Sequence, residues 1–229
     1  KIFKLRDFST VEKIKANNKN AELAVQKDWQ SPEGKSLLKE NTLYVFSEEG
    51  SQRSIEMTTT LTAQDQDVSF ADNKEGLIGI RIARELEHPS DKPEIFTDAN
   101  GNPTNVAALN NDRATGKYRS SEGIEGDDVW GTRGKWVNLT GKIGDEPVSI
   151  LILDNPKNVG YPTYWHARGY GLFAANPLGQ KEFSKGKETL NFNLKAGESV
   201  TFRYKVIIRS GTPLNDAEAN AAFQKFRKK

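Results

Sequence analysis

Alternation of apolar and polar residues runs through much of the chain and predicts β-strands. In the clearest case, residues 199–209, nearly every second residue is Val, Phe, Tyr or Ile, and Thr, Arg and Lys stand between them. A period of two is typical of a strand with one face in the core and the other in solvent. Residues 53–61 alternate in the same way, and residues 42–47 and 22–28 are shorter candidates.

A second pattern is a continuous apolar run at residues 148–153, which predicts a central strand covered on both faces. Shorter runs bring the expected total to about a dozen strands, separated by turn residues. Many short strands without intervening helical patterns favour an all-β, antiparallel β-sandwich. The length of 229 residues fits one sandwich domain spanning residues 1–229.

Two regions depart from this rhythm. Residues 87–128 contain three prolines and several Asn/Asp clusters, which predict a long irregular loop. Within it, the acidic start at Asp98 suggests a calcium loop, but Leu109 stands where a glutamate should be, so a plain turn is favoured. At the C-terminus, Asn215 and Glu218 form a capping-box pattern before an apolar stripe. This predicts a helix at about residues 215–228, packed on the sandwich.

Residues 77–84 divide into an isoleucine face and a second face that carries Gly79 and Arg81. A glycine beside an arginine suggests a surface that something approaches closely. The alternative is an edge glycine beside a solvated arginine.

Composition excludes several classes of function. The 33 Lys+Arg residues nearly balance 31 Asp+Glu, which argues against nucleic acid as the main partner. The absence of cysteine excludes disulfides, thiolate metal sites and cysteine nucleophiles, and two histidines cannot form a three-histidine metal site within this chain. Apolar runs such as residues 150–153 are far shorter than the roughly 20 residues that span a bilayer.

Two segments combine charged and aromatic residues that a sandwich does not need for stability. In residues 72–76, Glu75 could act as a general acid or base beside Lys74, and the alternative is a solvated turn. In residues 130–136, two tryptophans flank an arginine. Indoles stack on sugar rings and guanidinium groups bind hydroxyls; the alternative is core tryptophans with an arginine stem packed on them.

A third segment, residues 161–177, carries five aromatic residues, one histidine and one arginine. In an extended chain, Tyr164, His166, Arg168 and Tyr170 share one face, because side chains alternate between the two faces of a strand. We interpret this row as facing a ligand, against the alternative of a histidine with a structural role.

These motifs resemble a bacterial family catalogued as "methane oxygenase PmoA-like", a domain of unknown function, over nearly the whole chain. The matching stretches are residues 28–34, 70–76, 129–133, 161–171 and 175–179. The resemblance implies a soluble β-sandwich in the style of galactose-mutarotase-like supersandwich proteins, found among exported proteins of polysaccharide-degrading bacteria. It does not imply methane oxidation, since this chain lacks a membrane span and has few copper ligands. Family members usually carry a His-His-Arg-Gly stretch before the point that matches Lys1, so a missing N-terminal segment or a second chain would complete the site.

The leading hypothesis is a carbohydrate-active protein, an enzyme acting on a sugar or oligosaccharide as an epimerase, lyase or hydrolase. Glu75 and His166 would be the catalytic acid/base pair. The residues expected to contact substrate are Lys74, Arg81, Trp130, Arg133, Trp136, Tyr164, Arg168 and Tyr170.

Two alternatives stay open: a non-catalytic glycan-binding module, and a structural subunit that needs a partner. The sequence requires no cofactor and assigns no metal ligand set, although His166 with carboxylates could hold a divalent ion. The missing initiator Met and the lack of cysteine favour a periplasmic or secreted location.

Overall fold

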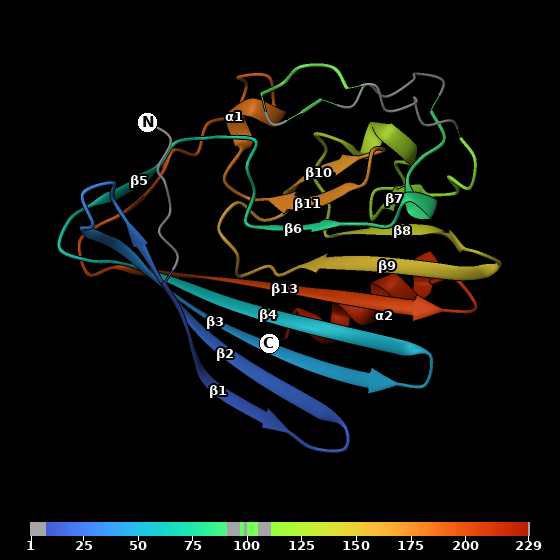
Figure 1. Ribbon diagram of the computed structural model, residues 1–229, viewed down its shortest axis with the longest axis horizontal. Coiled ribbons are helices and arrows are strands. Elements are labelled where there is room, and N and C mark those ends of the chain that lie inside the picture. The colour runs from blue at the N-terminus through green and yellow to red at the C-terminus, as the bar shows by residue number, and fades with distance from the viewer. Residues whose placement is uncertain (1–7, 91–96, 99, 105–110, 229) are drawn as a thin grey trace.

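The computed structural model, which describes residues 8–90, 97–98, 100–104 and 111–228, contains two antiparallel sheets that face each other and a separate strand pair (Figure 1). The large sheet has the order β1 (Phe8–Ala16), β2 (Asn20–Gln30), β3 (Ser36–Glu49), β4 (Gln52–Ala63), β13 (Ser199–Ser210), β9 (Glu146–Asp154), β8 (Trp136–Ile143) and β7 (Lys117–Ser120).

The small sheet has the order β10 (Tyr164–Arg168), β11 (Leu172–Asn176) and β6 (Ile78–Arg81). The strand pair consists of β5 (Val68–Phe70) and β12 (Phe192–Leu194). The helices are η1 (Arg84–Leu86), η2 (Gly126–Val129), α1 (Gln180–Phe183) and α2 (Asp216–Phe226). The predicted all-β antiparallel sandwich with a C-terminal helix is confirmed.

The main core lies between the two sheets. From β13, the alternating Phe202 and Tyr204 are fully buried, and from the small sheet Trp165 and Phe173 meet them in the same cluster. Burying a side chain of this size contributes about 1.5–3 kcal/mol relative to leaving it exposed. The inner face of the small sheet therefore packs on the large sheet. The side chains that alternate with Trp165 and Phe173 lie on its outer face.

Strand β9 is covered on both faces, as its continuous apolar run predicts. Ile150 and Ile152 belong to the core between the sheets. Leu151 and Leu153 point the other way, into a second cluster beneath α2.

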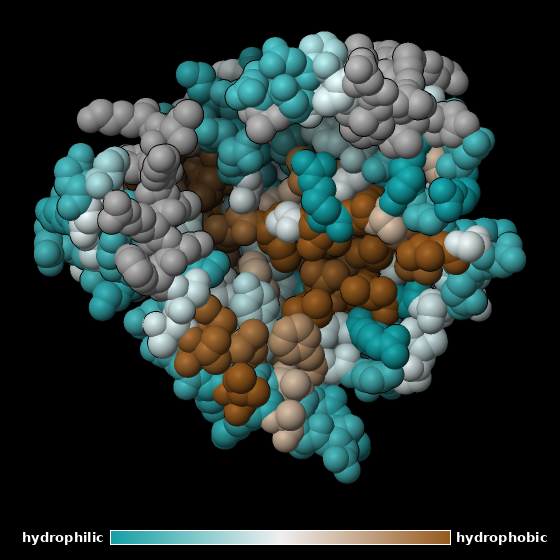
Figure 2. Space-filling model, viewed as in Figure 1, coloured by the Kyte–Doolittle hydropathy of each residue, from teal (hydrophilic) through white to brown (hydrophobic). Residues whose placement is uncertain are grey.

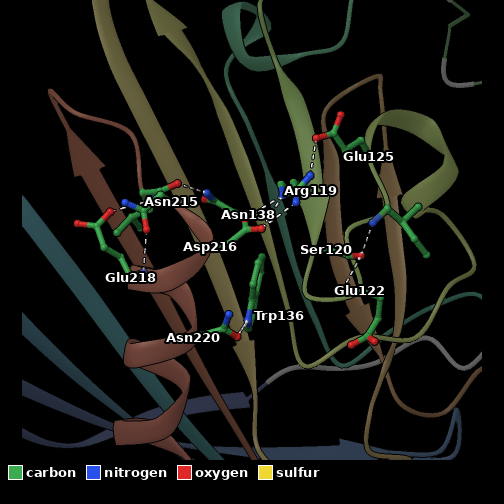
Figure 3. A network of polar contacts seen from close by, with 12 residues as sticks. Arg119, Ser120, Glu122, Glu125, Trp136, Asn138, Asn215, Asp216, Glu218 and Asn220 are labelled. Carbon is green, nitrogen blue, oxygen red and sulfur yellow. Dashed lines mark hydrogen bonds and ion pairs between the residues drawn. The ribbon is translucent and has the colours of Figure 1, made fainter.

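Helix α2 is fixed to the far side of the large sheet by polar contacts (Figure 3). Asn215 caps it by accepting from the backbone amide of Glu218 at 3.0 Å, the predicted capping box. At the same end, the Arg119 guanidinium of β7 donates to both carboxylate oxygens of Asp216 at 2.9 Å. The cap gives a backbone N–H group of the first turn a hydrogen-bond acceptor. The helix then packs Phe223 against the large sheet.

Three details differ from the sequence prediction or add to it. The alternating pattern at residues 77–84 corresponds to a shorter strand, since β6 ends at Arg81 and η1 begins at Arg84. The stretch predicted as an irregular loop, residues 87–128, contains β7 and the first three residues of η2. Asp98 accepts from the backbone amides of Asn100 and Asn102, at 2.8 and 2.9 Å, as in the plain turn that was favoured there. Leu109 lies outside the described residues.

The sandwich face of the large sheet is not fully covered by the described part of the chain. One cross-strand row runs from Val206 through Ile55 and Phe46 to Ala21, and its exposure increases from 6% at Val206 to 36% at Phe46. Figure 2 shows apolar side chains gathered in a hollow on this side of the molecule. Such a surface is what the partner-chain hypothesis requires, and that hypothesis stays a prediction. Within the described ranges, every helix is too short or too polar to cross a membrane.

Candidate functional site

The three segments singled out in the sequence meet at strand β10. The segment at 130–136 lies against it, since the Trp165 amide donates to the Thr132 carbonyl at 3.0 Å and the Gly131 amide donates to the Trp165 carbonyl at 2.9 Å. The turn at 72–76 is fixed to the neighbouring strand, where the Asn176 side chain donates to the Asn73 carbonyl at 2.8 Å. Contacts between distant parts of the chain therefore assemble one surface.

The outer face of the small sheet carries the polar row. Cross-strand pairing aligns His166 with Ala174 and Gly79, and it aligns Arg168 with Leu172 and Arg81. The residues between them on β10, Trp165 and Ala167, point into the core. His166 and Arg168 therefore share the face that also carries Gly79 and Arg81.

His166 has a defined protonation pattern. Its Nδ1 lies 3.1 Å from the carbonyl oxygen of Lys74, so we assign the proton to Nδ1, which leaves the lone pair on Nε2. Burial lowers the pKa of His166, and the charge of Arg168 lowers it further, while the Lys74 carbonyl and the Glu75 charge act in the opposite direction. The ring is 8% exposed and lies against Trp130 and Phe183. A neutral imidazole with a free Nε2 can accept a proton.

The side chains of Glu75 and Lys74 do not contact His166, although Glu75 was predicted as its catalytic partner and Lys74 as a substrate contact. The Glu75 side chain is exposed and influences His166 through its charge, with no hydrogen bond to the ring. Its backbone amide donates to the Asn73 side chain at 3.0 Å, which holds the turn. Lys74 contacts His166 through its backbone carbonyl, while the lysine residue is exposed.

Arg168 lies over the ring of Trp130, with its Cζ 4.4 Å from the ring centroid. The Nε atom of Arg168 and the indole Nε1 of Trp130 are both buried and have no hydrogen-bond partner among the described residues. Nearby, Arg81 lies 5.7 Å from the ring centroid of Tyr170, which is 47% exposed. Tyr170 belongs to the turn after β10 and not to the strand.

A pocket of about 230 Å³ opens beside Arg168. It lies at the end of β10, next to η1 and η2. Its lining residues are Arg84, His88, Pro89, Ser90, Asn111, Asp127, Trp130, Ala167, Arg168, Gly169 and Tyr170. His166 does not line this pocket. It contacts the ring of Trp130, which does.

His88 is a fixed part of the pocket wall. Its Nε2 accepts from the backbone amide of Tyr118 at 3.1 Å, so its Nδ1 carries the proton and donates to Asp127 at 3.0 Å. The His88 amide also donates to the Gly169 carbonyl at 2.9 Å. Because both ring nitrogens are occupied, His88 holds the wall together and has no free atom for proton transfer.

Arg133 and Tyr164 form a closed structural pair. Arg133 donates to the carbonyl oxygens of Gly160 and Pro162, at 3.0 and 2.6 Å, and also pairs with Glu188. Its guanidinium covers one face of the Tyr164 ring at 4.3 Å, and Phe183 is stacked on that ring with centroids 5.6 Å apart. Neither face of Tyr164 is free to stack on a sugar, and Arg133 lies outside the pocket lining.

Trp136 is also remote from the pocket. It is 1% exposed beneath α2, and its indole nitrogen donates to Asn220 at 3.1 Å (Figure 3). The structure therefore corrects its expected role as a stacking residue. The interpretation as a core tryptophan, which the sequence left open, describes it.

Five polar lining residues were not among the candidates from the sequence: Arg84, His88, Ser90, Asn111 and Asp127. Asp127 lies three residues before the candidate Trp130, and His88 is one of two histidines, so both had a weak signal. In the described part of the chain, no three His, Asp or Glu side chains gather closely enough to hold a metal ion.

The fold and site together define a two-sheet antiparallel β-sandwich protein with a polar, aromatic-walled pocket at the edge of the small sheet. Residues 6–224 match a family described as "family of unknown function (DUF6807)", and the chain belongs to this family. No curated protein matches the chain.

Proposed function

We propose that this chain is a carbohydrate-binding protein that holds one sugar unit in the pocket beside Arg168. The observation that carries the proposal is the arrangement of Arg168 over Trp130 next to the exposed ring of Tyr170. Sugars have apolar C–H faces that pack on aromatic rings and a rim of hydroxyls that pair with polar groups. The volume of about 230 Å³ lies just below the range of drug-sized pockets, which suits a single ring.

The polar lining supports the same proposal. Ser90, Asn111 and Asp127 place hydroxyl, amide and carboxylate groups in the pocket lining, where Asn111 Oδ1 accepts from the Ser90 amide at 2.6 Å. A small set of polar groups set among aromatic walls is typical of ligand sites in which orientation matters. The resemblance to the PmoA-like family and an exported location belong to this proposal and rest on the sequence alone.

A second candidate is acid/base catalysis on the bound sugar, of the isomerase, lyase or hydrolase type. It is favoured by one observation: His166 lies on the same sheet face as Arg168, its Nδ1 contacts the Lys74 carbonyl, and its Nε2 forms no hydrogen bond with a described residue. A ligand extending from the pocket across Trp130 would bring a proton within reach of Nε2, and Glu75 would serve as the opposing acid.

Titration calorimetry with a panel of neutral and acidic monosaccharides tests the binding proposal. We expect binding by the wild type, and a loss of at least tenfold in affinity for Trp130→Ala and Tyr170→Ala. Phe46→Ala, an exposed aromatic on the large sheet, is the matched control and should bind normally. If no sugar binds, or if the control loses as much affinity as Tyr170→Ala, the proposal is wrong.

The catalytic candidate has a separate test. Any sugar that binds is incubated with the protein, and its products are followed by NMR. Catalysis predicts turnover that disappears in Glu75→Gln and His166→Ala while sugar affinity is retained. Binding without any chemical change over long incubation supports the non-catalytic module.

A further inference from the structure

Arg168 is a partly buried cation without a counter-charge. Its guanidinium lies on Trp130, its Nε is buried without a partner, and it forms no ion pair or hydrogen bond through its side chain with any described residue. Its two terminal nitrogens are not among the buried, unpartnered atoms, and the residue lines the pocket. Keeping a cation partly desolvated and unpaired is costly, unless a ligand supplies the missing charge.

A second arginine without an acidic partner in the described residues lies on the same face. Arg81 and Arg168 both pair with Leu172 of β11, one from each side, so their backbones are two strand spacings, or about 10 Å, apart. Arg81 lies against the exposed Tyr170 and forms no ion pair with the described part of the chain. The face therefore presents two uncompensated positive charges beside the pocket.

The other charged residues around the pocket have contacts of their own. Arg84 pairs with Glu87, and Asp127 accepts a hydrogen bond from the neutral His88 ring. Asp127 is 77% exposed, so its charge is screened by solvent more strongly than the charge of a buried group. Of the two arginines that line the pocket, Arg168 is therefore the one without an ion-pair partner among the described residues.

We propose that the sugar bound in the pocket carries a carboxylate, as a hexuronate does, and that Arg168 holds this group. The inference rests on the proposed function, since it assigns the chemical class of the same ligand. A guanidinium is planar and carries its terminal N–H groups in one plane, and a carboxylate can accept two of them side by side. Arg81 lies farther from the pocket and attracts the acidic ligand through its charge.

The experiment compares glucuronate and galacturonate with glucose, galactose and galactose 6-sulfate by calorimetry at low and high salt. We expect the hexuronates to bind at least tenfold more tightly than the neutral sugars, with affinity falling as salt rises. Arg168→Gln should remove this preference. Arg168→Lys should also weaken binding about tenfold, because a lysine keeps the charge but not the planar fork.

Two matched variants complete the design. Asp127→Asn keeps an oxygen acceptor for the His88 ring and removes the negative charge, so hexuronate affinity should rise a few-fold. Arg53→Gln, an exposed arginine on β4 paired with Glu48, should leave binding unchanged. Thermal melting of each variant shows that it is folded.

The outcomes separate the two proposals. Equal binding of neutral sugars and hexuronates, or an unchanged preference in folded Arg168→Gln, overturns the carboxylate assignment and leaves the sugar-binding proposal intact. Tighter binding of the sulfated sugar than of the hexuronates also overturns it. If no sugar of any kind binds, both proposals are wrong.

Discussion

The Nδ1 atom of His166 lies 3.1 Å from the carbonyl oxygen of Lys74, and this contact joins strand β10 to the turn at residues 72–76. It fixes the proton on Nδ1 and directs the free lone pair of Nε2 away from the turn. With burial, which lowers the pKa of the ring, it defines His166 as a neutral base.

The protonation of His166 can be measured directly. Long-range ¹H–¹⁵N spectra recorded between about pH 4 and pH 8 should show the Nδ1–H form and a pKa below the ordinary value of about 6.5. With only two histidines in the chain, the spectrum of His166→Gln assigns the signals. A pKa at or above the ordinary value, or an Nε2–H form, would contradict the assignment.

Gly76 allows the turn to approach β11 closely. A Cβ at this position would lie 2.8 Å from the Cβ of Asn176 and 3.0 Å from the carbonyl oxygen of Ala175. We expect Gly76→Ala to lower the free energy of unfolding by about 1–3 kcal/mol and to shift the ¹⁵N signals of His166, because the turn must move. Urea denaturation and the same spectra measure both effects.

Gly79→Ala is the control for that experiment. Its added methyl would meet the Cβ of Ala174 at 3.3 Å and nothing closer, so a small displacement accommodates it. If Gly76→Ala and Gly79→Ala were equally stable, and His166 unchanged in both, the close approach of the turn would have no energetic significance.

Periodicity was a good guide to individual strands and to the faces of their side chains. The alternation over residues 199–209, the apolar run of β9 and the cap at Asn215 all appear in the structure as expected, because each depends on neighbours in sequence. The shared face of His166 and Arg168 follows from the same rule.

What covers a face could not be predicted from local pattern. Trp136 has the sequence context of a ligand-stacking residue, but α2 packs on it, and Phe183 of α1 covers Tyr164 in the same way. Part of the pocket wall comes from residues 84, 88–90, 111 and 127, which are far from β10 in sequence. Such non-local packing leaves no periodic signal.

Asp154 is a fully buried carboxylate at the end of β9 and predicts a specific pH dependence. It accepts hydrogen bonds from the Asn155 and Thr163 amides and from the Asn158 side chain, at 2.7 to 2.9 Å. Burial nevertheless raises its pKa to about 7. The folded protein therefore keeps a proton that the unfolded chain releases near pH 4, so this contribution to stability is lost as the pH rises from about 4 to about 7.

Comparison with Asp154→Asn isolates this effect, because the asparagine does not titrate. The difference in unfolding free energy between wild type and variant should shift against the wild type as the pH rises through that window, by at most about 4 kcal/mol. Urea denaturation at several pH values measures it. A difference that stays constant with pH would show that the carboxyl titrates normally.

The cap of α2 gives the last prediction. Asn215 accepts from the Glu218 amide. Glu218 in turn accepts from Arg209 and from the Asn215 amide, and these two contacts lower the pKa of Glu218 to about 2. Asn215→Ala leaves the first turn without its acceptor and should lower the free energy of unfolding by about 1 kcal/mol, while Asn215→Asp keeps the acceptor and should retain stability. The carboxylate of Glu218 adds stability above about pH 4.5, and this contribution is lost as the pH falls towards 2. The stabilities of Asn215→Ala and wild type should therefore be compared at neutral pH, where Glu218 is fully ionised in both. Equal stability of both variants in urea denaturation would show that the contact between Arg119 and Asp216 holds the helix without the cap.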